Sequence, residues 1–163
     1  MLPVLKDILF ATDLSQNATN ALRHAISIAR GAGAKVHVLH VTEPLTQDAI
    51  VTMRMFIQDD ASRKKAIQER HASVKAMLKT NQQEFVQSLP EADRAAYTAT
   101  VASVELVDGH AAESILQRAK DLNCGMIVMG THEHGTGHTF IGTVVKRVLR
   151  RSTIPTLIVP NAM

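Results

Sequence analysis

Short, almost continuous apolar runs alternate with segments of helical character along this chain of 163 residues. Residues 7–12 and 126–129 are runs of this kind, and each ends next to a residue that favours a turn. Such runs are typical of strands that are buried on both faces, as in parallel sheets. Each parallel strand must be joined to the next by a crossover, so few folds are compatible with this pattern. Further strands are predicted at residues 35–41, 98–107 and 156–159.

Helices are predicted between these strands. Residues 18–32 carry alanine and leucine at helical spacing, and they follow five residues rich in helix-capping side chains. Residues 48–88 also have helical character, with a break expected at residues 59–62 and an end at Pro90. The last two helices are expected at residues 111–122 and 144–151.

This order of elements predicts an α/β fold, a three-layer α/β/α sandwich around a five-stranded parallel sheet. Each strand–helix–strand unit is expected to be right-handed. We expect residues 1–163 to form one domain with a long helical insertion at about 48–88. Pro155 and Pro160 flank the last strand, which predicts that it lies at an edge of the sheet.

Composition and charge exclude several classes of function. The net charge is only +3 and aromatic residues make up 3%, so the chain lacks the clustered cations and stacking platforms of nucleic-acid-binding proteins. No apolar run approaches the ~20 residues of a membrane-spanning helix, and residues 1–6 lack the pattern of a secretory signal. The single Cys124 excludes an internal disulfide and a cysteine-based zinc site, and we expect a cytoplasmic location.

Three of the predicted strands end at Asp13, Val41 and Gly130. Ligands of open parallel sheets bind beyond the carboxyl ends of the strands, where the strand order reverses. The glycine-rich loop at residues 130–143 leads into a helix that opens at Gly142. Free backbone N–H groups at that helix start, together with the helix dipole, predict an anion site. The alternative interpretation is a flexible surface loop with no ligand.

Motifs at both ends of the chain carry a family resemblance. They are residues 8–15 (ILFATDLS), 126–132 (MIVMGTH), 142–150 (GTVVKRVLR) and 154–160 (IPTLIVP). In combination they resemble the universal stress protein family. The likeness covers almost the whole chain and is weakest from residue 46 to residue 98.

The resemblance implies a sheet of order 3-2-1-4-5, of the adenine nucleotide alpha hydrolase-like type, and in many members a bound ATP. It implies that Asp13 touches the ribose side, that Val41 covers the adenine, and that the phosphates lie on a loop of the form G-x2-G-x9-G-[ST]. The residues expected at this site are Ala11, Thr12, Asp13, Val41, Met129, Gly130, Thr131, His132, Gly135, Gly142, Thr143 and Val144.

The same resemblance implies the partners. The ligand would be ATP or another adenine nucleotide, with Mg²⁺ as its companion ion, and the protein would act in a stress response through binding. In family members the last strand pairs across a two-fold axis, which implies a homodimer through Thr156–Val159. Edge strands in general invite such pairing.

The phosphate loop departs from the family pattern. Eleven residues separate Gly130 from Gly142 where the pattern has twelve, and Glu133 occupies the second glycine position. A carboxylate ~4 Å from a phosphate charge costs about 1 kcal/mol in water and about 4 kcal/mol at an effective dielectric of 20. Gly135 and Gly137 can restore the turn if the loop shifts. The alternative to nucleotide binding is therefore a nucleotide-free dimerisation module of the same fold.

Other chemistry-bearing residues favour structural interpretations. His132, Glu133, His134 and His138 have metal-ligand chemistry, but adjacent loop residues rarely point at one centre, so no metal site is predicted. His37 and His40 lie on opposite faces of a strand and cannot share a ligand. Core packing is expected for Met53, Met55, Met77 and Met129.

The chain carries no motif of a dedicated enzyme. It has no P-loop lysine, no serine elbow and no recognisable pairing of a nucleophile with a base. We therefore expect a binding protein without catalytic residues. Any ATP hydrolysis or self-phosphorylation, at Thr143 or Ser15, is expected to be very weak.

Overall fold

The computed structural model describes residues 1–134 and 138–161, with the backbone alone described at residues 132–134 and 138–140. The chain forms β1 (Ile8–Ala11), α1 (Gln16–Ala32), β2 (Val36–Thr42), α2 (Gln47–Phe56), α3 (Asp60–Ser88), α4 (Glu91–Thr100), β3 (Val101–Asp108), α5 (Ala111–Asp121), β4 (Met126–Gly130), β5 (His132–His134), β6 (His138–Phe140), α6 (Thr143–Arg151) and β7 (Thr156–Val159).

Five strands form a parallel sheet in the order β3-β2-β1-β4-β7. Counted within this sheet, the order is 3-2-1-4-5, which confirms the expected fold. β7 lies at one edge, as the flanking prolines predict, and β3 lies at the other. The chain runs from β1 to β2 and β3 on one side and then crosses to β4 and β7 on the other. The strand order therefore reverses between β1 and β4.

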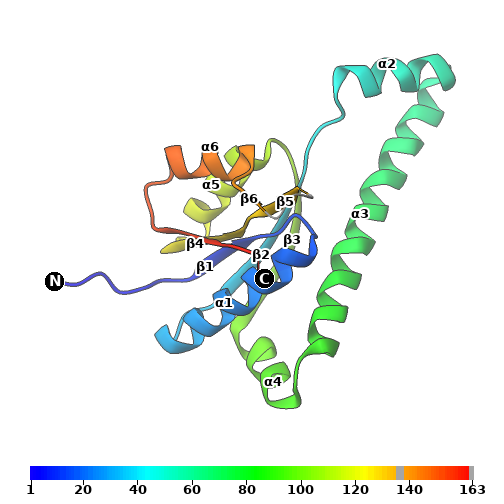
Figure 1. Ribbon diagram of the computed structural model, residues 1–163. Coiled ribbons are helices and arrows are strands. Elements are labelled where there is room, and N and C mark those ends of the chain that lie inside the picture. The colour runs from blue at the N-terminus through cyan, green and yellow to red at the C-terminus, as the bar shows by residue number, and fades with distance from the viewer. Residues whose placement is uncertain (135–137, 162–163) are drawn as a thin grey trace.

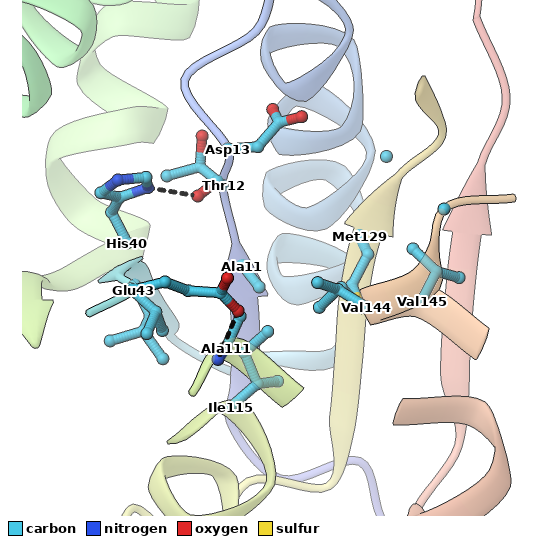
Figure 2. Close-up of a pocket in the computed structure, with 14 residues that line it drawn as sticks. Ala11, Thr12, Asp13, His40, Glu43, Ala111, Ile115, Met129, Val144 and Val145 are labelled. Carbon is cyan, nitrogen blue, oxygen red and sulfur yellow. Dashed lines mark hydrogen bonds between the residues drawn. The ribbon is translucent and has the colours of Figure 1, made fainter. Parts of the chain in front are cut away.

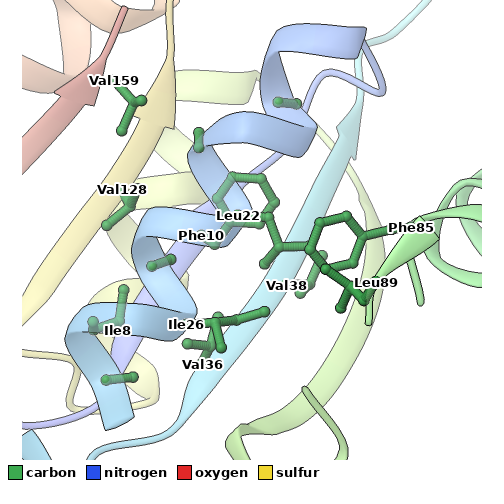
Figure 3. Close-up of a cluster of buried hydrophobic side chains, with 14 residues drawn as sticks. Ile8, Phe10, Leu22, Ile26, Val36, Val38, Phe85, Leu89, Val128 and Val159 are labelled. Atoms are coloured by element: carbon green, nitrogen blue, oxygen red, sulfur yellow. The ribbon is translucent and has the colours of Figure 1, made fainter. Parts of the chain in front are cut away.

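Helices cover both faces of the sheet (Figure 1). On one face α1 packs over Ile8, Phe10, Val36 and Val38, and Phe85 from the end of α3 joins the same core (Figure 3). On the other face α5 and α6 pack over a second core. The central strand β1 is buried along its whole length, which explains its continuous apolar run.

Local sequence signals set the helix ends. Ser15 caps α1 by accepting a hydrogen bond from the Ala18 N–H, and Gly33 ends it at a φ of 67°, in the left-handed region. The predicted break in residues 48–88 lies at residues 57–59, where Asp59 caps α3 by accepting from the Ser62 N–H.

Two predicted boundaries are wrong. Residues 98–100 belong to α4 and not to a strand, because Tyr97 and Thr100 of this helix pack inward and the Tyr97 ring contacts Phe85 at a centroid distance of 5.8 Å. The predicted glycine-rich loop at residues 130–143 contains the antiparallel pair β5 and β6. Within residues 1–134 and 138–161, no helix is both long enough and apolar enough to span a bilayer.

The prediction that the methionines pack in the core is only partly correct. α2 and the first turns of α3 stand away from the sheet (Figure 1), and none of the α2 residues is buried. Met129 packs in the core as predicted, but Met55 and Met77 are 74% and 56% exposed. Met55 is exposed because no residue of α2 is buried, and Met77 is exposed although its neighbour Leu78 is 4% exposed, so it lies on the outer side of α3.

Candidate functional site

A hollow of about 180 Å³ lies at the carboxyl ends of β1, β2 and β4, where the strand order reverses (Figure 2). The starts of α5 and α6 complete its wall. This is the place where open parallel sheets bind ligands. Eight of the residues expected at the site line it: Ala11, Thr12, Asp13, Val41, Met129, Gly130, Gly142 and Val144.

The turn after β1 presents Asp13 at the rim. The Asp13 carboxylate accepts a hydrogen bond from the Ser15 N–H at 2.9 Å, and the Leu14 N–H donates to the Thr12 hydroxyl at 3.0 Å. Leu14 has a φ of 66°, which is uncommon for a leucine and costs conformational energy. Ser15, and not Asp13, caps α1, so the position of Asp13 is not explained by capping.

His40 is a wall residue that sequence reasoning did not select. Its Nδ1 lies 2.7 Å from the Thr12 carbonyl oxygen, which can only accept a hydrogen bond (Figure 2). Nδ1 therefore carries the proton, and in the neutral imidazole Nε2 is left as an acceptor. The predicted separation of His37 and His40 is confirmed, since His37 contacts Ser103 and Asp7 instead.

Glu43 is a second wall residue that sequence reasoning missed. Its Oε1 accepts a hydrogen bond from the Ala111 N–H at 3.2 Å, the first amide of α5, whose N-cap residue His110 provides no side-chain hydrogen bond (Figure 2). A carboxylate at this helix end is favoured by the helix dipole. Because Glu43 and Ala111 are 68 positions apart, no sequence motif connects them.

The opposite wall is the start of α6. Gly142 is its N-cap residue and supplies no side-chain cap, and the first turn has no acidic residue. The first backbone N–H groups of an α-helix have no partner within the helix. With Asp13 and Glu43 on the other wall, the electrostatics of the hollow are asymmetric, and an anionic group is favoured on the α6 side.

Two expected residues, Thr131 and Thr143, do not line the hollow, and two others fall outside the described side chains. Thr131 is buried, and its carbonyl oxygen accepts a hydrogen bond from the Asn17 side chain at 2.6 Å. Thr143 is exposed at the first position of α6. The side chain of His132 and the whole of Gly135 lie outside the described residues, as do the Glu133 side chain and those of His134 and His138.

Gly130 has a steric role in addition to any ligand role. A Cβ at this position would lie 3.1 Å from the Asn17 Nδ2 atom, closer than ordinary van der Waals contact. The absence of a side chain lets α1 approach the end of β4 and form the bond from Asn17 to Thr131. Among the residues with described side chains, no group of three or more His, Cys, Asp or Glu is arranged for a metal ion.

The model of the universal stress protein family matches residues 5–160. The chain belongs to this family. Universal stress protein Slr1230 of Synechocystis sp. is 40% identical over 55 residues, which are 33% of this chain and 19% of that protein. The chain thus matches about a fifth of this relative's length.

Solved structures of universal stress proteins share the fold. A family member from Burkholderia pseudomallei is 25% identical with a TM-score of 0.59, covering 95% of this chain and 96% of that one. A universal stress protein in complex with cAMP is 20% identical, with a TM-score of 0.59 over 97% and 98% of the chains. One from Archaeoglobus fulgidus in complex with dAMP is 17% identical, with a TM-score of 0.55 over 96% and 98%.

Proposed function

We propose that this universal stress protein binds an adenine nucleotide in the hollow at the carboxyl ends of β1, β2 and β4, and that it acts in the stress response through binding. The observation that carries the proposal is the asymmetry of the hollow. A carboxylate, Asp13, lies on one wall, and the open amino end of α6 lies on the other. A nucleotide has a matching asymmetry, with hydroxyl donors on its ribose and anionic phosphates at its far end.

The proposed orientation follows from this match. The adenine lies against Val41, the ribose hydroxyls donate to Asp13, and the phosphates extend toward Gly142 and Thr143. The volume of the hollow supports this orientation. It is about 180 Å³, which is below the roughly 300–1,000 Å³ that is typical of sites that enclose a whole small molecule. The hollow therefore suits the nucleoside, and the phosphates would lie at its rim, with Mg²⁺ offsetting their charge. The complexes with cAMP and dAMP named for similar structures support an adenine nucleotide as the ligand.

Calorimetric titration with ATP and with AMP, each with and without Mg²⁺, tests the proposal. The informative variant is Thr143→Glu, because a carboxylate at the first position of α6 repels phosphate but is favourable to the helix. We expect ATP affinity to fall by about tenfold or more. Gln47→Glu is the matched control, since it makes the same change of charge at the first position of α2, outside the hollow. Absence of binding at millimolar nucleotide would refute the proposal.

We propose a second candidate function, self-association through β7, which does not require a nucleotide. β7 is hydrogen-bonded to β4 on one side and is an edge strand of the described sheet. Edge strands pair readily with another chain, and the first three residues of β7 are only half-buried. Light scattering after size exclusion should give the mass of a dimer at micromolar protein. A monomer at that concentration, with or without ATP, would contradict this candidate.

Catalysis is not part of the proposed function. Phosphate release from ATP should not exceed the uncatalysed background. Faster release that is lost in Thr143→Ala would overturn this expectation and identify the helix start as a hydrolytic site.

A further inference from the structure

Ser103, His37 and Asp7 form a hydrogen-bonded chain at the end of the sheet opposite the nucleotide hollow. The Ser103 hydroxyl lies 2.8 Å from His37 Nδ1, and His37 Nε2 lies 3.2 Å from Asp7 Oδ2. A nucleophile, a base and a carboxylate that orients the base are the parts of a catalytic triad. Sequence reasoning missed this arrangement because the contacts join residues 66 and 30 positions apart.

The protonation of the chain follows from its chemistry. An ionised carboxylate only accepts hydrogen bonds, so His37 Nε2 must carry the proton that it shares with Asp7. Nδ1 of the neutral imidazole is then the acceptor for the Ser103 hydroxyl proton. The Lys35 N–H donates to the other Asp7 oxygen at 3.0 Å, which fixes the orientation of the carboxylate. His37 is therefore held in the tautomer that a general base for serine requires.

A backbone irregularity brings the serine to the histidine. Val36 pairs with Val101, but His37 pairs with Ser103, so the residue between them, Ala102, is an extra residue of β3. Such β-bulges redirect side chains and are over-represented next to active sites. Without the bulge, His37 would pair with Ala102, and Ser103 would lie one register position away.

The surroundings leave the serine accessible. The His37 side chain is 13% exposed, whereas Asp7 is 38% exposed and Ser103 is partly exposed. β3 is an edge strand, and an edge strand presents backbone N–H groups with no partner in the sheet.

We propose that Ser103 is a reactive nucleophile that accepts acyl groups from activated esters. The Ser103 oxygen forms a bond to the acyl carbon while its proton passes to His37 Nδ1. The ester C–O bond breaks, and the leaving alcohol or phenol departs with the electron pair and takes up that proton. The product is an acyl-serine. Water then attacks its acyl carbon while His37 accepts a proton from the water, the bond between the acyl carbon and the Ser103 oxygen breaks, and that proton passes to the Ser103 oxygen, which releases the free acid.

A fluorophosphonate probe tests the nucleophile directly, because phosphorus bonds to the serine oxygen as fluoride leaves. Intact-mass and peptide mass spectrometry of the full chain should find one adduct, on Ser103. Ser103→Ala should abolish it. Ser73→Ala, which removes an exposed serine of α3, should leave it unchanged. No adduct, or an adduct on another serine, would overturn the proposal.

The variant Asp7→Asn tests whether Ser103 is activated by His37 and Asp7 or is only accessible to the probe. An asparagine in this position can hold the imidazole in the wrong tautomer, so we expect labelling and p-nitrophenyl acetate hydrolysis to slow by about tenfold or more. Circular dichroism monitors the fold of the variant. Unchanged labelling in a folded Asp7→Asn protein would mean that Ser103 is exposed but not activated, which also refutes the proposal. The outcome is independent of nucleotide binding, because none of the three residues lines the hollow.

Discussion

Cys124 lies in the core beneath α5 and is 6% exposed. Burial raises the pKa of its thiol to about 11 from an ordinary value of 9.0, and the Asp7 carboxylate acts in the same direction. The thiolate is the reactive form, so at pH 8 its population is roughly a hundredfold lower than for a free thiol. Cys124 is thus a buried free cysteine in an environment that disfavours its thiolate.

We therefore expect iodoacetamide to alkylate Cys124 in the native protein at least about a hundredfold more slowly than in protein unfolded in urea. Mass spectrometry of quenched samples at pH 8 measures both rates. Equal rates in the two states would contradict the burial of this thiol. The protein has one cysteine, so the signal needs no assignment.

Asp7 connects pH to stability. The hydrogen bond from the Lys35 backbone N–H, followed by that from His37, lowers the pKa of its carboxyl below the ordinary value of 3.8. A carboxyl with a lowered pKa stabilises the fold above its unfolded-state pKa, and this contribution disappears as the pH falls through the folded-state value.

Asp7→Asn should therefore unfold at a lower urea concentration than the original protein at pH 6. The difference between the two midpoints should narrow as the pH is lowered below about 4, where the carboxyl becomes protonated. Urea titrations followed by circular dichroism at several pH values measure this. A difference that stays constant down to the lowest pH would show that Asp7 does not act through its charge.

At the scale of elements, the end of α2 and the end of α3 differ in what they contact. Phe85, near the end of α3, is 3% exposed in the core under α1, whereas Phe56, at the end of α2, is 84% exposed. Apolar spacing alone does not distinguish them, because both lie in segments of helical character. The distinction depends on which part of each helix packs against α1 and the sheet, which is a tertiary property.

Replacing each phenylalanine by alanine should therefore have unequal effects. Phe85→Ala should lower the free energy of unfolding by about 3–5 kcal/mol, since it leaves a cavity beside Tyr97. Phe56→Ala should change it by less than about 0.5 kcal/mol, because its side chain is already in solvent. Urea unfolding gives both values. A large loss in Phe56→Ala would mean that a partner covers α2 in solution.

At the scale of the whole molecule, the proposed nucleotide couples to global stability. A ligand that binds only the native state stabilises it by about 2.7 kcal/mol at a concentration one hundred times its dissociation constant. For a chain of this size that is a rise in melting temperature of roughly 5–11 °C. We expect this rise with ATP in Gln47→Glu and a rise of about half that size or less in Thr143→Glu at the same ATP concentration, because a tenfold weaker site is stabilised by only about 1.4 kcal/mol. Differential scanning calorimetry measures both, and equal rises would place the phosphates away from α6.

The order of the five strands in the parallel sheet was predictable from the chain alone, whereas α4 and the pair β5 and β6 were not predicted. Buried strands such as β1 and β4 are short apolar runs, helix starts carry capping residues such as Ser15, and prolines flank the edge strand β7. These signals are local, because each depends on residues within a few positions of one another. The family motifs predicted that Asp13, Val41 and Gly142 lie together at the carboxyl ends of the strands, because each is close in sequence to the end of a strand or the start of a helix.

Tertiary structure alone decided which distant residues meet. Glu43 caps α5, His40 binds the turn after β1, and Ser103 reaches His37 only because β3 contains an extra residue. The helical state of residues 98–100 likewise depends on the packing of Tyr97 against Phe85. None of these contacts has a local signature, because each follows from strand register and helix position across tens of residues. Hydrogen bonding and packing in the assembled fold therefore determine them.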